Sequence, residues 1–206
     1  EDDYERIAGF VNTGEDRLKI PHWQNKAYGA PCQTACPTGI PTQDRINLLR
    51  QGKVREALEL VLHYSPFPAS VCGQVCPNLC KDACSRQYID HPVAMQELGK
   101  LSQDAAPPEK KPETGKRVAI IGGGPGGLSA AWQLSLLGHG VTLFEGDREV
   151  GGKLRQAIPM ERLPREILDC EIDRIKSMGT DIRTSQKIDK TAFDSLQDDY
   201  DVLIIA

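Results

Sequence analysis

The order of apolar and polar residues in the first half of the chain is typical of short helices. Apolar residues in the segment 54–62 recur at the spacing of one helix face, and Pro66 and Pro68 end that helix. Two further helices are predicted, one over 42–52, between a capping Thr and a terminating Gly, and one over 92–101. Because strand patterns are scarce here, we expect a small helical domain.

The second half of the chain alternates between strand-like apolar runs and amphipathic helices. Its predicted elements are, in order, a strand at 117–121, a helix at 127–137, a strand at 140–144, a helix at 163–178, and two strands at 181–183 and 202–205. This alternation predicts an α/β domain with a parallel sheet covered by helices. The last strand reaches the end of the sequence, so we expect an incomplete sheet and a longer polypeptide.

A stretch that cannot bury much apolar surface separates the two halves. Residues 105–116 contain three prolines and no large apolar side chain, which is typical of a linker. We therefore predict an α + α/β chain with a helical domain at 1–104, a linker at 105–116 and a Rossmann-like domain at 117–206. The helical domain offers few apolar residues for a core, so a bound metal would stabilise it.

Composition and charge exclude two classes of protein. The 206 residues include 25 Lys and Arg against 29 Asp and Glu, a net charge of −4, and basic residues do not cluster with aromatic ones. We therefore expect no nucleic acid partner. No apolar run approaches the roughly 20 residues that a membrane span requires, and the segment 1–6 is too charged for a signal peptide. We expect a cytoplasmic protein without a membrane span.

A glycine-rich loop joins the first predicted strand of the second half to the helix that follows. Gly122, Gly124 and Gly127 fit the pattern G-x-G-x-x-G, with Pro125 and Gly126 between the last two. In such loops the first glycine permits a tight turn, the second lets a pyrophosphate approach the backbone, and the third lets helix and strand pack closely. A glycine loop without a ligand is the alternative, and the strand and helix in register with the motif favour a dinucleotide site.

An acidic residue stands at the end of the second predicted strand. Glu145 lies about 18 residues beyond the glycine motif, where a carboxylate can accept a hydrogen bond from a ribose hydroxyl group and disfavours a 2′-phosphate. A solvated acid at a strand end is the alternative interpretation. A second glycine pair follows, and Gly152, Lys153 and Leu154 could belong to a loop that returns to the cofactor, although by composition alone this is only a turn.

Six of the seven cysteines lie in the first half of the chain, at Cys32, Cys36, Cys72, Cys76, Cys80 and Cys84. The first two form C-x3-C-P, and the other four follow one another at intervals of four, with Pro77 after Cys76. Thiolates followed by proline in a loop are typical of ferredoxin-like sites, where a cluster needs four ligands. The array therefore predicts an iron–sulfur centre.

Disulfides and structural zinc are the alternative interpretations of this array. Disulfides fit poorly because we expect a cytoplasmic chain. Zinc sites favour C-x2-C pairs or added histidines, and His63 and His91 lie off any such spacing. Cys170, on the predicted amphipathic helix, is expected to pack in the apolar core. A zinc-stabilised, non-enzymatic docking module fused to a nucleotide-binding domain is thus the alternative from a different class.

These motifs together resemble one family over nearly the whole chain. The matching segments are 31–32, 36–37, 71–77 and 92–95 with the last two cysteines of the run, and 151–164 in the second half. The chain is similar to the small (beta) subunit of glutamate synthase and to the N-terminal half of dihydropyrimidine dehydrogenase, a family of FAD and iron–sulfur oxidoreductases. Its segment 28–32 also resembles the iron–sulfur flavoprotein that accompanies dissimilatory sulfite reductase.

The resemblance implies an electron-transfer flavoprotein. FAD would bind the Rossmann-like domain, with Arg162 and Ile188 among its contacts, and 4Fe-4S clusters would bind the helical domain. In the family, a second Rossmann domain binds NAD(P)H, hydride reduces FAD, and single electrons leave through the clusters to a partner, such as the glutamate synthase large subunit or a sulfite reductase. We therefore expect a fragment of an NAD(P)H-dependent oxidoreductase that lacks the NAD(P)H domain and needs no general acid or base.

The sequence departs from the family pattern upstream of the first cysteine. Family members hold two 4Fe-4S clusters and use an additional C-x2-C pair, but Gln24 and Ala27 stand at those positions. By the family pattern, Cys32 and Cys84 would share the cluster that lost two ligands.

The second cluster of the family pattern keeps more of its ligands. It would take a fourth ligand that is not cysteine, beside Cys36, Cys76 and Cys80. Cys72 is usually a bystander in the family but could be recruited here. Six thiolates cannot fill eight positions, so either one cluster is lost or side chains such as Gln96 or Glu97 complete the set.

Overall fold

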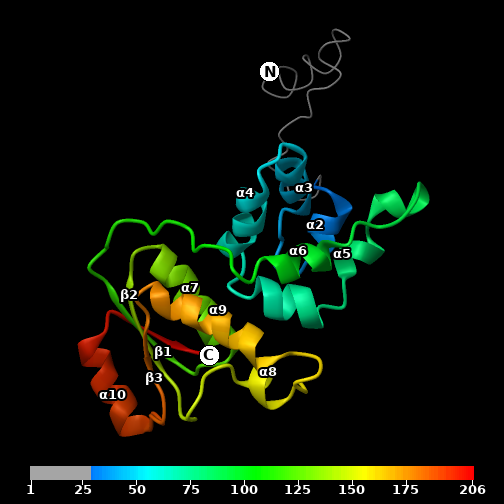
Figure 1. Ribbon diagram of the computed structural model, residues 1–206. Coiled ribbons are helices and arrows are strands. Elements are labelled where there is room, and N and C mark those ends of the chain that lie inside the picture. Colours follow the sequence, from blue (N-terminus) through cyan, green and yellow to red (C-terminus); the bar gives the residue numbers. More distant parts are fainter. Residues whose placement is uncertain (1–28) are drawn as a thin grey trace.

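The computed structural model of the protein describes residues 29–206. Figure 1 shows two bodies side by side, a helical one formed by the first half of the described chain and an α/β one formed by the second half. The predicted α + α/β architecture is therefore confirmed. Gln24 and Ala27 lie outside the described residues. Within the described part of the chain, no helix is long and apolar enough to cross a membrane.

The helical half is built from short elements. In chain order they are α2 (Pro31–Ala35), α3 (Thr42–Arg50), α4 (Val54–Glu59), η3 (Leu60–His63), η4 (Pro68–Val75), α5 (Leu79–Asp82), η5 (Ser85–Tyr88) and α6 (Met95–Leu101). The three predicted helices correspond to α3, to α4 with its continuation η3, and to α6. Gly52, with φ of +75°, ends the first of them as expected. The other elements are too short to show a helical period in the sequence.

The π-helix η4 carries Cys72 and packs directly against α6. Pro68 is its first residue, a position where the backbone N–H has no partner within the helix, so that proline fits there. The two elements touch at glycines, since a Cβ atom on Gly99 would lie 2.8 Å from the amide nitrogen of Gly73 and 3.1 Å from Cys72 Sγ. The prolines do end the preceding helix, but a new helical segment follows them. The two cysteines that precede a proline, Cys36 and Cys76, lie outside the helices as expected, whereas Cys72 and the cysteines of α2 and α5 lie within helical segments.

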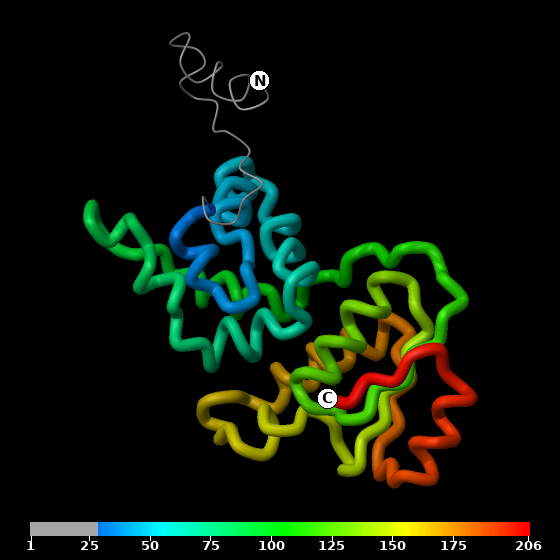
Figure 2. The backbone as a smooth tube through the Cα atoms, turned by 180° about the vertical axis from the view of Figure 1, so that it is seen from behind, coloured from blue at the N-terminus to red at the C-terminus, as the bar shows by residue number. Residues whose placement is uncertain are grey.

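The second half is a parallel sheet with helices on it. Its elements are β1 (Arg117–Ile121), α7 (Pro125–Leu136), β2 (Gly140–Phe144), α8 (Lys153–Gln156), α9 (Arg165–Ser177), β3 (Asp181–Arg183), α10 (Lys190–Asp199) and β4 (Val202–Ile205). The strand order is β3-β2-β1-β4, and Val118 of β1 lies between Val141 of β2 and Val202 of β4. Figure 2 shows β4 beside β1 and α10 at the edge away from the helical half. Every predicted strand is confirmed, and α8 and α10 are additional.

One apolar core runs through both halves. Leu62 and Phe67 of the helical half belong to the same buried cluster as Leu128 and Trp132 of α7. Trp132 is completely buried and donates a hydrogen bond from Nε1 to the carbonyl oxygen of Leu62 at 2.7 Å. Because a buried indole N–H needs a partner, this bond fixes the position of the helical half on α7.

A buried carboxylate forms a second contact between the halves. Glu171 of α9 accepts hydrogen bonds from the backbone N–H groups of Ala69 at 2.6 Å and Ser70 at 3.1 Å, and from the Ser70 hydroxyl group. Arg174, on the same helix, donates to the carbonyl oxygen of Gln103. Burial raises the pKa of Glu171 to about 7, although the hydrogen bonds and Arg174 act in the opposite direction. The first turn of η4 is thus held by a side chain of the sheet half.

The segment 105–116 contains no helix or strand and runs along the end of α7. The N–H of Lys111 donates to the carbonyl oxygen of Leu136 at 2.9 Å. Cys170 lies near the start of this segment, half-buried, with its Sγ 3.8 Å from the carbonyl oxygen of Gln103. Cys170 is therefore a residue of the interface between the halves rather than of the buried apolar core.

Candidate functional site

The glycine loop lies at the carboxyl end of β1, where the chain turns into α7. Gly122 has φ of +112°, a conformation that glycine adopts without strain. A Cβ atom on Gly127 would overlap the carbonyl oxygen of Gly122, whereas one on Gly124 would meet nothing within 4 Å. Pro125 and Gly126 begin α7, whose first N–H groups have no partner within the helix. Close packing at the third glycine and open space at the second are what a pyrophosphate-binding loop requires.

Glu145 follows β2 and lies against the glycine loop. Its Oε2 accepts a hydrogen bond from the N–H of Gly123 at 2.7 Å, and its Oε1 accepts one from the N–H of Asp147 at 2.9 Å. The carboxylate is thus fixed by two backbone donors beside the loop. This placement fits a ribose acceptor better than a freely solvated acid.

The second glycine pair returns to the first loop. The N–H of Gly151 donates to the carbonyl oxygen of Gly123 at 2.7 Å. A Cβ atom on Gly152 would lie only 2.9 Å from the Cα atom of Gly124, and Gly152 has φ of +46°. Both the close approach and the backbone conformation therefore favour glycine at position 152.

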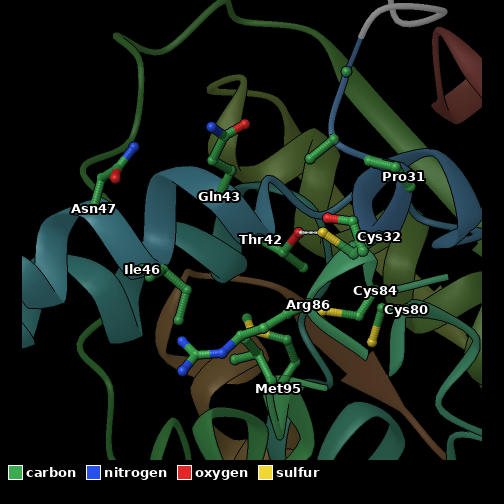
Figure 3. Close-up of a pocket in the computed structure, with 14 residues that line it drawn as sticks. Pro31, Cys32, Thr42, Gln43, Ile46, Asn47, Cys80, Cys84, Arg86 and Met95 are labelled. Atoms are coloured by element: carbon green, nitrogen blue, oxygen red, sulfur yellow. Dashed lines mark hydrogen bonds between the residues drawn. The ribbon is translucent and has the colours of Figure 1, made fainter. Parts of the chain in front are cut away.

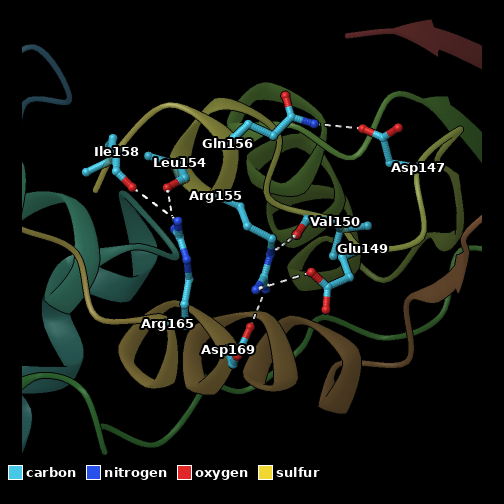
Figure 4. Close-up of polar contacts among 9 residues, drawn as sticks. All are labelled: Asp147, Glu149, Val150, Leu154, Arg155, Gln156, Ile158, Arg165 and Asp169. Carbon is cyan, nitrogen blue, oxygen red and sulfur yellow. Dashed lines mark hydrogen bonds and ion pairs between the residues drawn. The ribbon is translucent and has the colours of Figure 1, made fainter. Parts of the chain in front are cut away.

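The short helix α8 is fastened onto α9 by two arginines (Figure 4). Arg155 of α8 pairs with Asp169 of α9, and Arg165 of α9 donates to the carbonyl oxygen of Leu154 at 3.1 Å. Lys153 is the first residue of α8. The side chain of Leu154 is buried in the core, so Leu154 supports the returning loop from behind.

Arg162 lies between the two halves. It precedes α9, and its Nη2 donates to the carbonyl oxygen of Val75 at 3.3 Å. Val75 is the last residue of η4 and directly precedes Cys76. The residue that the family resemblance places at the flavin therefore touches the segment that carries the cysteines.

Ile188 lies between β3 and α10 and is half-buried. Its segment runs beside the end of β2, since the N–H of Gln186 donates to the carbonyl oxygen of Glu145 at 2.8 Å. The segment that contains Ile188 thus lies at the carboxyl end of β2, beside Glu145.

Four of the predicted metal ligands surround one cavity of about 280 Å³. We call it the four-cysteine cavity, and its thiols are those of Cys36, Cys72, Cys76 and Cys80. The rest of its wall is mainly apolar and includes Ile40, Phe67 and Val71. Iron–sulfur clusters are held by cysteine thiolates, so these four thiols could hold one.

Burial alters two of these thiols. It raises the pKa of Cys72 to about 11. The pKa of Cys80 is also raised, first by burial and then by the neighbouring thiols of Cys76 and Cys36. Without a metal these thiols are therefore protonated at neutral pH, so ligation of a metal centre has to release protons.

A second cavity, of about 540 Å³, has fewer thiols around it (Figure 3). Cys32, Cys80 and Cys84 line it, and Cys80 also lines the four-cysteine cavity. Cys32 Sγ lies 2.8 Å from the hydroxyl oxygen of Thr42. Cys32 and Cys84 are the two residues that the family resemblance assigns to the cluster that lost two ligands.

The candidate ligands other than cysteine make other contacts. Gln96 Oε1 accepts a hydrogen bond from Asn78 Nδ2 at 3.1 Å, and Glu97 pairs with Lys100 at 2.9 Å on the surface. Neither lines the four-cysteine cavity. Within residues 29–206, no three His, Cys, Asp or Glu side chains converge on a point that could hold one metal ion.

One residue of the four-cysteine cavity is not indicated by the sequence. Arg45 of α3 lines the cavity and is completely buried. A single arginine in a short helix is ordinarily exposed, so no sequence pattern distinguishes Arg45 from a surface residue.

Comparison with protein families finds one match in each half of the chain. Residues 25–111 match the family described as dihydropyrimidine dehydrogenase domain II, 4Fe-4S cluster. Residues 120–185 match the NAD(P)-binding Rossmann-like domain. These matches support a 4Fe-4S cluster in the first half and a dinucleotide in the second.

Several curated proteins are similar to most of this chain. It is 36% identical over 189 residues to the NADPH-Fe(3+) oxidoreductase subunit beta of Geobacter sulfurreducens, covering 87% of the chain and 28% of that protein. It is 33% identical to the glutamate synthase (NADPH) small chain of Mycobacterium tuberculosis, covering 85% and 37%. It is 35% identical to the NAD-dependent dihydropyrimidine dehydrogenase subunit PreT of Escherichia coli O157:H7, covering 80% and 42%.

The chain spans less than half the length of these relatives. All three are oxidoreductase subunits by name, which favours an electron-transfer role over a zinc-stabilised docking module. The resemblance that the motifs indicate is thereby confirmed: the chain is similar to the glutamate synthase small chain and to a dihydropyrimidine dehydrogenase subunit, and its first half matches a 4Fe-4S cluster domain.

Proposed function

We propose that this chain passes electrons between FAD, bound at the glycine loop, and a 4Fe-4S cluster held in the four-cysteine cavity. The observation that carries the proposal is the hydrogen bond between Arg162 and the carbonyl oxygen of Val75. By family resemblance Arg162 reaches the flavin, and Val75 directly precedes Cys76. One side chain would therefore touch both redox sites.

The preference for FAD over a nicotinamide dinucleotide rests on the second glycine pair and on Arg162. The glycine loop and Glu145 would bind the ADP part, which both kinds of dinucleotide share, and the family match names NAD(P). The loop around Gly152 and Arg162 are the features that the resemblance assigns to the flavin. Both belong to the segment that leads from β2 towards the helical half.

For the cluster we propose an all-cysteine ligand set of Cys36, Cys72, Cys76 and Cys80. The family pattern supplies a non-cysteine ligand beside three cysteines, but Gln96 is engaged by Asn78 here and Cys72 lines the cavity instead. We propose a single fully ligated cluster, because the second cavity has two thiols of its own and shares a third.

When bound, FAD accepts two electrons together and releases them singly. The residues of this chain would bind and position: the loop at Gly124 would hold the pyrophosphate and Glu145 a ribose hydroxyl group. The apolar wall of the four-cysteine cavity would exclude water from the thiolates. This role requires no general acid or base.

The activity of the whole protein is a wider proposal. Relatives carry NADPH or NAD in their names and are described as subunits. We propose an NAD(P)H-dependent oxidoreductase in which a further domain supplies hydride. A partner subunit, similar to the glutamate synthase large subunit or to a sulfite reductase, would exchange the electrons. We also propose a cytoplasmic location, because cluster assembly requires reduced thiols.

Stepwise anaerobic reduction of the FAD-loaded and iron-loaded chain tests the proposal. Flavin absorbance and the electron paramagnetic resonance of the reduced cluster would be followed together during photoreduction. We expect electrons to distribute between both centres. Arg162→Ala should slow or abolish this exchange, and Arg148→Ala, an exposed arginine on the loop after β2, should not. Reduction of the flavin with no exchange at all would contradict the proposal.

A further inference from the structure

Arg45 is a cation placed inside the protein with only neutral partners. It is 0% exposed. Its Nε donates to the carbonyl oxygen of Ala57 at 2.8 Å, and its Nη2 donates to the carbonyl oxygen of Leu98 at 3.2 Å and to Ser102 Oγ at 3.0 Å. These three bonds hold the guanidinium rigidly but leave its charge uncompensated.

The remaining nitrogen of the guanidinium, Nη1, is buried without a hydrogen-bond partner. Among the ion pairs of the described residues, none involves Arg45. A buried charge without a counter-charge is strongly unfavourable, and unpaired buried donors are rare in native proteins. Among residues 29–206, therefore, no carboxylate compensates the charge of Arg45.

The four-cysteine cavity is where that anion would lie. Arg45 and Cys72 both line it. Burial lowers the pKa of Arg45, and the nearby Cys72 acts against this effect. A cluster ligated by four thiolates carries net negative charge and can compensate the guanidinium.

We propose that Arg45 is the counter-charge of the cluster in the four-cysteine cavity, with its Nη1 donating a hydrogen bond to a sulfur atom there, and that it raises the reduction potential of the cluster. The inference rests on the proposed function, because it needs a cluster at this place. One electron from the flavin adds one negative charge to the cluster, while Arg45 keeps its proton. A fixed cation in a medium of low dielectric constant stabilises the reduced form, as do hydrogen bonds to sulfur.

Arg174 offers a matched control. Its Nη1 is likewise buried without a partner. It lies on α9, however, and lines neither of the cavities that contain cysteines. Burial lowers the pKa of Arg174, and Glu171 on the same helix opposes that shift, whereas no carboxyl group of residues 29–206 acts on Arg45 in this way.

Potentiometric titration of the cluster, followed by electron paramagnetic resonance, tests the proposal on four proteins: the parent chain, Arg45→Gln, Arg45→Lys and Arg174→Gln. Iron and sulfide are measured first in each. At a fixed solution potential we expect the ratio of reduced to oxidised cluster to fall at least tenfold in Arg45→Gln, a shift of about 59 mV. Arg45→Lys keeps the charge and should stay near the parent, as should Arg174→Gln.

The outcomes separate this inference from the function on which it rests. A parent chain without iron would refute the proposed function itself. An iron-loaded Arg45→Gln protein with the parent's potential would overturn the role of Arg45 alone, as would an equal shift in Arg45→Lys. If Arg45→Gln loses its iron, retention of iron by Arg45→Lys supports the proposal. Loss of iron from both variants would show that the hydrogen bonds of the guanidinium are needed and its charge is not, which would overturn the proposal.

Discussion

The sheet half and the helical half differ in what holds them together. In the sheet half, β1 pairs in register with β2 and β4. Apolar residues of α7 and α9, helices of 12 and 13 residues, lie in one buried cluster with those of β1 and β2. In the described part of the helical half the longest helix, α3, has nine residues. Its cysteine-bearing turns surround cavities rather than a filled core.

The helical half is held in part by side chains of the sheet half. Trp132 bonds to Leu62, and Glu171 holds the first turn of η4, both from the sheet half. The thiols around the four-cysteine cavity offer a further support if a cluster joins them. The sheet half gains its stability locally, whereas the helical half gains it from docking and, in our account, from metal ligation.

Removal of one cluster ligand should have the largest effect, and this effect should be confined to the helical half. Cys76→Ser is expected to lose most of its iron and much of the helical circular dichroism of residues 31–101, because metal binding and folding are coupled in a small domain. The signal of the sheet half should persist. Cys170→Ser is the control, since its thiol lies at the interface and lines neither cysteine cavity. Full iron content and unchanged helicity in Cys76→Ser would contradict the claim that metal ligation stabilises the helical half.

Two glycine substitutions separate folding from cofactor binding in the sheet half. Gly127→Ala places a methyl group on the carbonyl oxygen of Gly122, so we expect a loss of about 3 kcal/mol in the free energy of unfolding. Gly124→Ala meets nothing within 4 Å and should fold normally, yet lose FAD because the methyl group enters the pyrophosphate space. Urea denaturation and flavin content measure the two effects. Flavin retention by Gly124→Ala would show that the loop is not the binding site.

The hydrogen bonds that Glu171 accepts from η4 should make docking of the two halves depend on pH. Its pKa is about 7 in the folded chain and ordinarily 4.5, so the folded state binds the extra proton between these values. The stabilisation is therefore fully present below about pH 4.5 and is lost as pH rises through 7, by roughly 2–3 kcal/mol. Glu171→Gln should flatten this part of the stability profile. Asp173→Asn, on the exposed face of α9, should leave the profile as in the parent. An identical profile in Glu171→Gln would contradict the burial argument.

The smallest effect is expected at Glu145, which follows the carboxyl end of β2. Glu145→Ala should weaken FAD binding by about 1–3 kcal/mol, the usual contribution of a hydrogen bond to a charged group. Equilibrium titration of the apoprotein with FAD measures this. Glu149→Ala, an exposed acid on the same loop, is the control. Equal dissociation constants for Glu145→Ala and the parent would leave Glu145 as a residue that only braces the glycine loop.

The comparison also explains what could be predicted from the sequence. Buried parallel strands and a glycine loop have local patterns, so the strands and the turn at Gly122 are visible in the residues themselves. The π-helix η4 has no such pattern, because its shape depends on the close approach of Gly73 and Gly99. Arg45 and Glu171 are charged residues that a sequence pattern places on the surface, yet contacts from distant segments bury both.

The central claim, that the helical half holds an iron–sulfur cluster beside a flavin site, is tested most directly by the metal and flavin content of the chain purified without oxygen. We predict about four iron and four sulfide per chain, one FAD and no zinc. Cys76→Ser should lose iron but keep FAD, and Gly124→Ala should lose FAD but keep iron. A colourless chain that contains zinc and no sulfide would contradict the account.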